Sequence, residues 1–551
     1  CTFHADRVRF ETSWPTLSAH ITAWVSPEDD IEFRQVELRN LSDESIEMEL
    51  VSAFDVSLSD PRADEAHPAF TNLFVNAGWL GAHQALWFER KPRLPTEQSL
   101  QLAHFLADVQ AHVLGLRCQT DRQRWLGRNH GRGQPLASLN PLPAKGAEAM
   151  VRLVTGLDPV CALAVRLRIG PNAKARLTFA TTACDRGTTL RAVIDKYRQP
   201  SHIQRSALMS TTLSGIRLRA LRISARNLLA IQTLTTALVQ SLGNGPDRVT
   251  RPDGNGTRVC DRRLLWRFGL SGERALILVT IGDPQGLALV RALGEALRLW
   301  AWGGIACDLV VVNAEPVSYL MTLQRELLAL RERHAAGAAE HGNAAATSFA
   351  VLRADELSPD EVSTLQAQAR LRLHADERPL PLHVGEWTAL HEQALALRGA
   401  TARVALLPCT GVVGAAPSGE FVAETGEFRF DVSPDLRPAR PWINVLANPD
   451  FGAHLSEAGG GYTWALNSRL MQLTAWSNDP VADPPAEWFL VQDLTTGEAW
   501  SVAPNVHGAR GVAYHVAHGQ GYSLIRQRRA GLDVTACWCV DPRASVKQVR
   551  L

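Results

Sequence analysis

Residues 31–50 read IEFRQVELRNLSDESIEMEL and contain the clearest indication of the fold class. Apolar residues alternate with polar ones from Ile31 to Leu38, the polar sequence NLSDES interrupts them, and the alternation resumes from Ile46 to Leu50. A period of two is typical of a strand with one buried face. Two such runs on either side of a turn sequence predict a β-hairpin.

The same period extends over most of residues 1–185, where ARLTFATTA at 175–183 is a further expected strand. Few segments in this range keep the helical period for long. The pattern therefore predicts a large antiparallel sheet packed as a β-sandwich. Period two returns at 441–551, which is interpreted as the start of a second sandwich that is cut short by the end of the sequence.

Between these two β-rich ranges the pattern changes. Residues 186–258 are predicted to form helices followed by a turn-rich loop, LGNGPDRVTRPDGNGTR. Residues 259–396 alternate apolar runs such as ALILVTI and CDLVVVN with helical runs, which predicts a small α/β connector. SPDEVSTLQAQARL has the sequence of a capped helix. Residues 397–440 are rich in Gly, Ala and Pro and are interpreted as a linker. The predicted fold class is thus mainly β with an α/β part.

Composition limits the possible functions. The net charge of the 551 residues is +1, which gives no general attraction for nucleic acid or anionic membranes. The nine cysteines have no zinc-ligand spacing and are interpreted as reduced thiols, so no metal site is predicted. The sequence contains no uncharged apolar run of about 18 residues, so no membrane span is predicted. The sequence begins with Cys1 and stops within an alternating pattern, which suggests a slice of a longer protein.

The two β-rich ranges share a short internal similarity. WVSPEDDIEFRQVEL at 24–38 resembles WCVDPRASVKQVRL at 538–551, and both are patterned as strands. This similarity suggests two related sandwich repeats.

Residues 459–480 combine three glycines with aromatic and planar polar residues. Tyrosine and tryptophan rings can stack on sugar rings, and amide, guanidinium and carboxylate groups can bond sugar hydroxyls. The alternative is a strand whose aromatic residues belong to the core, followed by a turn at SNDP. The candidate carbohydrate-binding residues are Tyr462, Trp464, Asn467, Arg469, Trp476, Asn478 and Asp479.

Other polar residues favour structural roles. His518 beside two glycines is more typical of a hydrogen-bonded structural histidine than of a ligand. His67 and Asp64 have no third residue at metal-ligand spacing, and Asp283 has the position of a helix start. The α/β connector has no glycine-rich phosphate-binding motif, and no serine has a GxSxG context.

The motifs from residue 448 onward carry a family resemblance. NPDFGAHLSEAGGGYTWALNSRLMQLTAWSNDP and YHVAHGQGYS resemble the N-terminal β-sandwich of the cellobiose phosphorylase family, also described as glycosyltransferase family 36 type. More narrowly, they resemble the C-terminal half of cyclic β-1,2-glucan synthases. HPAFTNLFV at 67–75, GLDPVCALAVRLRIGP at 156–171, DKYRQP at 195–200 and the stretch 266–320 are similar to preceding parts of those synthases.

The resemblance implies a carbohydrate-active enzyme that makes or trims cyclic β-1,2-glucan. Such synthases are large inner-membrane proteins with an upstream glycosyltransferase module that uses UDP-glucose, which places this segment at the cytoplasmic face. In the phosphorylase family an (α/α)6 barrel follows the sandwich and carries the general acid. That barrel lies outside the 551 residues, so no catalytic residue and no cofactor are assigned to them. The expected partners are a β-1,2-glucan, the barrel and the membrane module.

Two functions from different classes remain open. The first is a region of a glycoside phosphorylase-like enzyme that binds or positions carbohydrate. The second is a non-catalytic carbohydrate-binding or scaffold protein. An open reading frame that continues into several hundred helix-patterned residues would favour the first.

Overall fold

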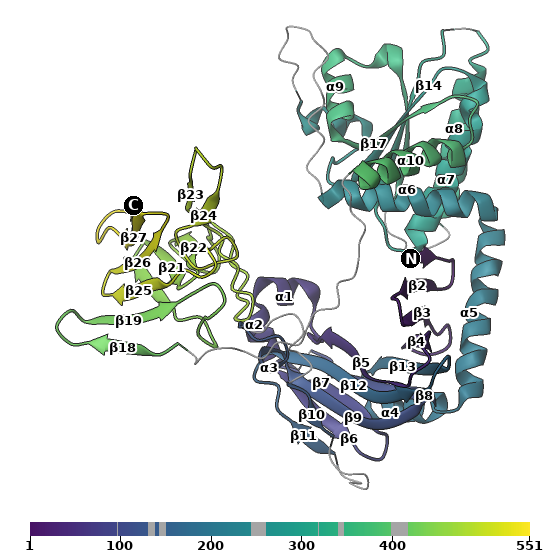
Figure 1. Cartoon of the computed structure of the whole chain (residues 1–551). Helices are drawn as coiled ribbons and strands as arrows, with labels where there is room; N and C mark the ends of the chain where they lie inside the picture. The colour runs from purple at the N-terminus through teal and green to yellow at the C-terminus, as the bar shows by residue number, and fades with distance from the viewer. Residues whose placement is uncertain are drawn as a thin grey trace. The chain divides into compact units, whose positions relative to one another are not determined.

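The computed structural model describes residues 1–95, 97–129, 138–142, 150–243, 260–317, 319–339, 347–397 and 417–551. They form two compact units, and Figure 1 traces the chain through both. The first unit combines the described residues of 8–207, the N-terminal β part, with those of 417–551, the C-terminal β part. The second unit contains residues 2–7 and the described residues of 208–404.

The N-terminal β part is a sandwich of antiparallel sheets. Its strands are β2 (Val8–Ser13), β3 (Leu17–Val25), β4 (Ile31–Asn40), β5 (Ile46–Asp55), β6 (Val75–Leu80), β7 (Ala85–Arg90), β8 (Leu100–Gln110), β9 (His112–Asp121), β10 (Asn140–Pro141), β11 (Val151–Leu153), β12 (Pro159–Ile169) and β13 (Lys174–Cys184). One sheet has the order β2-β3-β4-β13-β8-β7-β6-β11, and the other has the order β10-β9-β12-β5. Phe88, Leu163 and Leu177 lie in the core between them. The predicted antiparallel sandwich and the strand at 175–183 are confirmed.

The hairpin predicted for residues 31–50 is wrong in its pairing. Both strands form, but β4 pairs with β3 and β13, whereas β5 pairs with β12 in the other sheet. The sequence NLSDES carries the chain from one sheet to the other. Asn40 is fully buried at this crossing, and its amide donates hydrogen bonds to the carbonyl oxygens of Glu44, Ile169 and Gly170.

Short helices cover the edges of this sandwich. They are α1 (Pro61–Ala66), α2 (Pro68–Asn72), α3 (Arg122–Leu126), α4 (Gly187–Tyr197) and the first residues of α5 (Pro200–Ala220). Helix α4 packs Ile194 and Tyr197 against Ile31 and Phe33 of β4. Val36 and Leu38 of the same strand face the core between the sheets instead, so β4 is buried on both sides.

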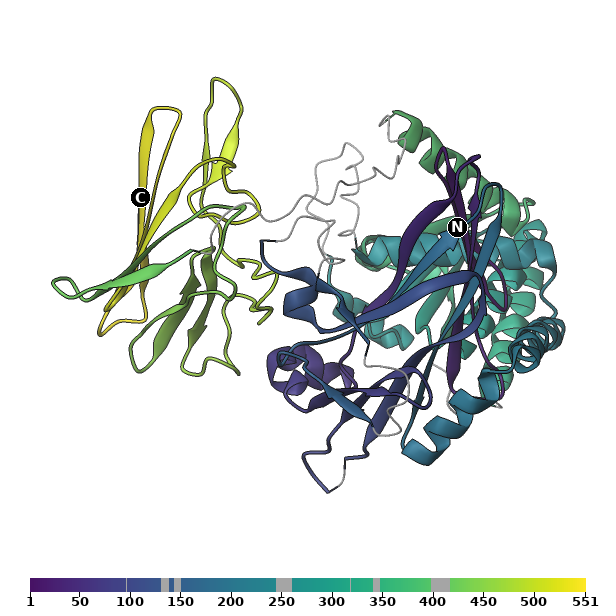
Figure 2. The ribbon, with the colours of Figure 1, turned by 60° about the horizontal axis from the view of Figure 1, so that its bottom comes forward.

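The C-terminal β part is also antiparallel (Figure 2). Its strands are β18 (Gly419–Val422), β19 (Glu427–Val432), β20 (Asn444–Ala447), β21 (Phe451–Ser456), β22 (Gly459–Ala465), β23 (Leu490–Gln492), β24 (Ala499–Ser501), β25 (Tyr514–Gly519), β26 (Tyr522–Arg529), β27 (Leu532–Val540) and β28 (Lys547–Arg550). The main sheet has the order β18-β19-β25-β26-β27-β28, and a smaller one has the order β20-β21-β22. The range 397–440 is therefore not all linker, because β18 and β19 lie in it. The alternation of apolar and polar residues in these two strands is short and flanked by glycines, so the sequence did not indicate them.

The two similar stretches of sequence adopt similar local structures. Residues 24–38 lie in the hairpin of β3 and β4, where Trp24 pairs with Phe33. Residues 538–551 lie in the hairpin of β27 and β28, where Trp538 pairs with Val549. Both tryptophans are buried.

The second unit is an α/β layer structure. Besides β1 (Thr2–Phe3), its elements are α6 (Ala225–Gly243), the 3-10 helices η2 (Arg262–Phe268), η3 (Pro284–Gly286) and η4 (Ala354–Glu356), β14 (Ala275–Ile281), α7 (Leu287–Trp302), β15 (Cys307–Asn313), α8 (Thr322–Ala339), β16 (Ser348–Arg353), α9 (Pro359–Gln368), β17 (Ala369–Ala375) and α10 (Leu380–Leu397). The parallel sheet has the order β16-β15-β14-β17. Ile277 and Val279 of β14 face a core with α6, α7 and α10, whereas Leu276 and Leu278 face η2 and α9.

This unit confirms the predicted strands and the capped helix. Ser358 and Glu361 form a capping box at the start of α9. Helix α6 lies in the range 186–258, which was predicted to be a helical segment separate from the α/β connector. It packs on the α/β core through residues such as Ile231 and Leu234. The loop predicted at 242–258 lies outside the described residues from 244 onward, as does 398–416 of the predicted linker.

Candidate functional site

The glycine-led segment begins with β22, and its glycines make room for neighbouring side chains. A Cβ atom at Gly461 would lie 2.4 Å from Nδ1 of His454, and one at Gly452 on β21 would lie 2.2 Å from Cζ2 of Trp464. Both distances are far below van der Waals contact. The glycines therefore let two aromatic side chains lie flat on the β21–β22 hairpin.

Aromatic rings gather on this hairpin. The rings of Tyr462 and Trp476 are stacked, with centroids 4.8 Å apart and an interplanar angle of 9°. Trp464 lies 5.1 Å from Tyr462, and His454 lies 5.5 Å from Trp476. Tyr462 is 7% exposed, whereas Trp464 and Trp476 are half-buried. The cluster is thus partly core and partly surface, and two indole rings keep exposed area at its edge.

Some of the predicted polar residues have hydrogen-bond partners within the protein, and others have none among the described residues. Asn467 closes the turn after β22, because its Oδ1 accepts from the backbone N–H groups of Arg469 and Leu470. Arg469 is exposed, and its guanidinium has no partner among the described residues. The amide of Asn478 lies 3.3 Å from Nδ1 of His67.

Asp479 is held by a cation from the N-terminal β part. Its two carboxylate oxygens each accept a hydrogen bond of 3.0 Å from Arg122, and one of them also accepts from the backbone N–H groups of Val481 and Ala482. Burial acts to raise the pKa of Asp479, but these hydrogen bonds outweigh it and lower that pKa. The carboxylate is therefore ionised at neutral pH and already satisfied.

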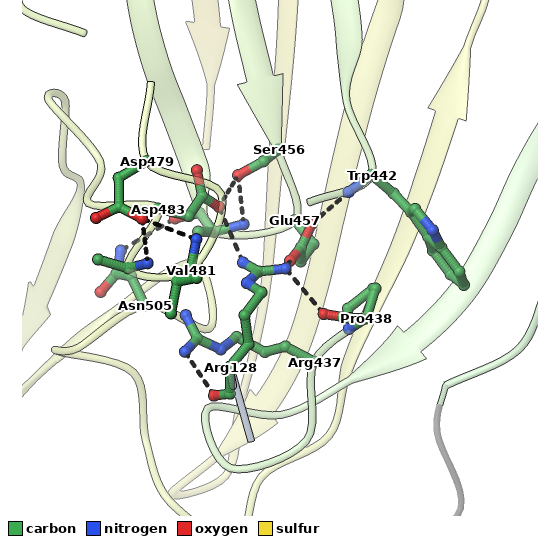
Figure 3. A network of polar contacts seen from close by, with 12 residues as sticks. Arg128, Arg437, Pro438, Trp442, Ser456, Glu457, Asp479, Val481, Asp483 and Asn505 are labelled. Atoms are coloured by element: carbon green, nitrogen blue, oxygen red, sulfur yellow. Dashed lines mark hydrogen bonds and ion pairs between the residues drawn. The ribbon is translucent and has the colours of Figure 1, made fainter. Parts of the chain in front are cut away.

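A buried ionic network joins the loop after α3 to the β21–β22 hairpin (Figure 3). The side chains of Arg128 and Glu457 are both 0% exposed and meet at 2.5 Å. Arg128 also bonds Asp483 at 3.0 Å, and Asp483 accepts from Ser456 at 2.8 Å. The backbone N–H of Trp442 donates to the other oxygen of Glu457. Burial raises the pKa of Glu457, while the Arg128 charge opposes that rise.

The sequence did not predict the two arginines that bond the carboxylates of this region. Arg122 and Arg128 come from α3 and the loop after it, more than 300 positions before Asp479 and Glu457. No local pattern connects residues so far apart. His454 had a local signal, since it lies one strand before the glycines that leave space for its ring.

The other polar residues singled out in the sequence have structural partners. His518 is buried, with Nδ1 at 3.0 Å from Ser523 Oγ and Nε2 at 3.1 Å from the Trp442 carbonyl oxygen. Asp64 accepts a hydrogen bond from Thr71, and Asp283 caps η3. Within the described residues no group of three or more His, Cys, Asp and Glu side chains could hold a metal ion. No described helix is long and apolar enough to cross a membrane.

A concavity lies on the main sheet of the C-terminal β part, with a volume of 670 Å³. Its lining includes Glu427, Arg429, Asp431, His515 and Arg526. Four of these side chains pair with each other, Glu427 with Arg429 and Asp431 with His515. Phe430 is the one Phe, Tyr or Trp side chain in this lining and is 4% exposed, so the concavity lacks the exposed indole rings of the β21–β22 cluster.

Comparison with known proteins connects both β parts to one family. The family model for the glycosyl hydrolase 94, supersandwich domain, matches residues 1–200 and 426–551. The cyclic beta-(1,2)-glucan synthase NdvB of Rhizobium meliloti is 26% identical over 565 residues, an alignment that covers 100% of this chain and 20% of the synthase. The chain thus spans about a fifth of that relative's length. An α-galactosidase structure from Lactobacillus brevis shares 10% identity, with a TM-score of 0.17 and coverage of 94% of this chain and 84% of that one.

Proposed function

Since the chain belongs to the glycosyl hydrolase 94 supersandwich family, we propose that it is a carbohydrate-contacting region of an enzyme that makes or trims cyclic β-1,2-glucan. The alignment with a cyclic β-1,2-glucan synthase over the whole chain supports this substrate. The larger protein would contribute the barrel, with its general acid, and the membrane glycosyltransferase module. The chain would then lie at the cytoplasmic face of the inner membrane.

One observation carries the proposal: two half-buried tryptophans stand at the edge of a fixed aromatic cluster, and the exposed Arg469 in the loop after β22 has no side-chain partner among the described residues. Trp464 rests on Gly452, and Trp476 rests on Tyr462, so both rings are held before any ligand arrives. Such preorganisation lowers the entropic cost of binding. The apolar face of a glucosyl ring can stack on an indole, while Arg469 donates to its hydroxyls.

The role of this region is to hold or shape a glucan chain. We assign no catalytic residue to it. The carboxylates near the cluster, Glu457, Asp479 and Asp483, are all bonded to arginine, and Glu457 is fully buried. A general acid needs access to the glycosidic oxygen and a proton to give, and none of these three groups has both.

A calorimetric titration with linear β-1,2-glucan tests the proposal. Trp464→Ala and Trp476→Ala should each weaken binding by about 1–3 kcal/mol, the scale of losing a large buried side chain. Trp266→Ala is the matched control, because Trp266 is 57% exposed and lies on η2 of the second unit. Unchanged affinity in folded Trp464 and Trp476 variants would assign both rings to the core. Phosphate uptake or release by this chain with β-1,2-glucooligosaccharides would overturn the non-catalytic role.

A specific observation favours a second candidate, a scaffold function. Leu466, Leu470, Met471 and Leu473, in the loop after β22, are 66%, 79%, 48% and 60% exposed. An exposed apolar group of this kind is typical of a protein contact surface. Under this alternative the loop would dock on another part of the larger protein, and Leu470→Ser would leave glucan affinity unchanged while weakening that docking.

A further inference from the structure

The aromatic cluster does not end at the C-terminal β part. The ring of His67, between α1 and α2, lies 6.2 Å from the ring of Trp476. On its other side His67 lies 5.7 Å from Phe70, and Phe70 lies 5.4 Å from Phe74. Rings from two distant parts of the sequence therefore form one row, in which His67 is the link.

Hydrogen bonds fix the orientation of His67 and the position of its proton. Its Nδ1 accepts from the backbone N–H of Phe70 at 3.3 Å and lies 3.3 Å from the amide nitrogen of Asn478. Nδ1 is therefore an acceptor, and the neutral ring carries its proton on Nε2. Nε2 has no hydrogen-bond partner among the described residues and is not buried. It is a donor that is left for solvent or a ligand.

A cation continues the row. The guanidinium carbon of Arg93 lies 4.7 Å from the ring centroid of Phe70 and 5.3 Å from that of Phe74. Arg93 is exposed, and Phe70 is 39% exposed. Cation–π contact holds the guanidinium in place while its N–H groups keep their capacity to donate.

We propose that His67, Phe70 and Arg93 form an additional subsite for a β-1,2-glucan chain, next to the one at Trp464 and Trp476. This inference rests on the proposed function. The row alternates flat apolar rings with outward hydrogen-bond donors, His67 Nε2 and the Arg93 guanidinium. Sugar rings need both, whereas an apolar protein surface would leave those donors unpaired. The subsite therefore binds glucosyl units of a longer chain. We expect a disaccharide seated on Trp464 to be too short to reach Phe70 and Arg93, which follow Trp476 and His67 along the row.

The test compares sophorose, the β-1,2-linked disaccharide, with a long linear β-1,2-glucan. Phe70→Ala and Arg93→Ala should weaken binding of the long chain by about three- to tenfold and leave sophorose affinity unchanged. His67→Asn keeps a side-chain acceptor for the start of α2 but removes the ring and the Nε2 donor, and it should have the same effect. Leu73→Ala is the matched control, since Leu73 is 48% exposed on the same helix end and is not in the row.

The outcomes separate this inference from the proposed function. If the unaltered chain binds neither sugar, the proposed function fails. If Trp464→Ala weakens binding while the Phe70, Arg93 and His67 variants bind the long glucan like the unaltered chain, only the additional subsite is excluded. Equal weakening for sophorose and the long chain would also contradict it, because the effect would then not depend on chain length.

Discussion

The guanidinium of Arg128 and the carboxylate of Glu457 meet at 2.5 Å, and neither side chain has any exposed area. Arg128 belongs to the N-terminal β part and Glu457 to the C-terminal β part. A buried charge pair contributes little net stability compared with apolar residues, but losing one member leaves the other charge uncompensated. The pair therefore makes the positions of α3 and the β21–β22 hairpin depend on each other.

Arg128→Met should strongly destabilise the first unit. Removing the cation leaves Glu457 and Asp483 without their shared partner, a loss on the order of 3–5 kcal/mol. Urea unfolding followed by tryptophan fluorescence measures it. Arg124→Met is the control, because the Arg124 side chain is 66% exposed and, among the described residues, pairs only with Asp121, so its effect should stay below about 1 kcal/mol. Equal effects of the two variants would show that the buried pair has no special role.

Gly452→Ala should weaken glucan binding without removing any contact group. The new methyl would lie 2.2 Å from Trp464 Cζ2, so the indole must leave its place on the hairpin. Affinity for linear β-1,2-glucan should fall about as much as in Trp464→Ala. Gly115→Ala serves as control, since no atom lies within 4 Å of a Cβ at that position. Full affinity in Gly452→Ala would mean that the orientation of Trp464 is not needed.

Asp479→Asn should reduce stability more than it reduces glucan affinity. Its carboxylate is already bonded to Arg122, so the variant loses charged hydrogen bonds worth about 1–3 kcal/mol. Asp533→Asn is the control, because Asp533 pairs with Arg528 at 3.6 Å with both side chains 78% exposed, and no measurable change is expected. A large drop in affinity with unchanged stability would instead make Asp479 a direct sugar ligand.

His104 should make the first unit lose stability in mild acid. Burial lowers its pKa from 6.5 to about 3, so the folded chain does not take up this proton between those values, whereas the unfolded chain does. The contribution of the neutral His104 to the free energy of unfolding is complete above pH 6.5 and decreases as the pH falls towards 3. One proton corresponds to about 1.4 kcal/mol per pH unit.

The variant His104→Phe keeps a ring to stack on Phe179, and its free energy of unfolding should change less steeply with pH over this range. His112→Gln, at an exposed position, should keep the slope of the unaltered chain. If the two variants have the same slope, the buried histidine is not the source of the acid sensitivity.

Local patterns in the sequence predicted most elements but not how they associate. Alternation predicted β13, and the capped-helix sequence SPDEVSTLQAQARL predicted α9. The pairing of β4 with β13 instead of β5 could not be predicted this way, because a turn sequence between two strands has the same composition whether the chain stays in one sheet or crosses to another.

In the candidate site, too, the local residues could be predicted from the sequence but their distant partners could not. The residues of 459–480 were singled out by type, and the structure brings Tyr462, Trp464 and Trp476 together. Their role in binding stays a prediction. Arg122 and Arg128 bond Asp479 and Glu457 across more than 300 positions, and one sequence has no signal for such contacts.

Hydroxyl-radical footprinting, read by mass spectrometry residue by residue, measures whether a glucan chain covers the aromatic cluster. Linear β-1,2-glucan should protect Trp464 and Trp476 from oxidation and leave Trp266, which is 57% exposed, as reactive as before. Equal oxidation of Trp464 and Trp476 with and without saturating glucan would contradict the claim that this aromatic cluster binds the glucan chain.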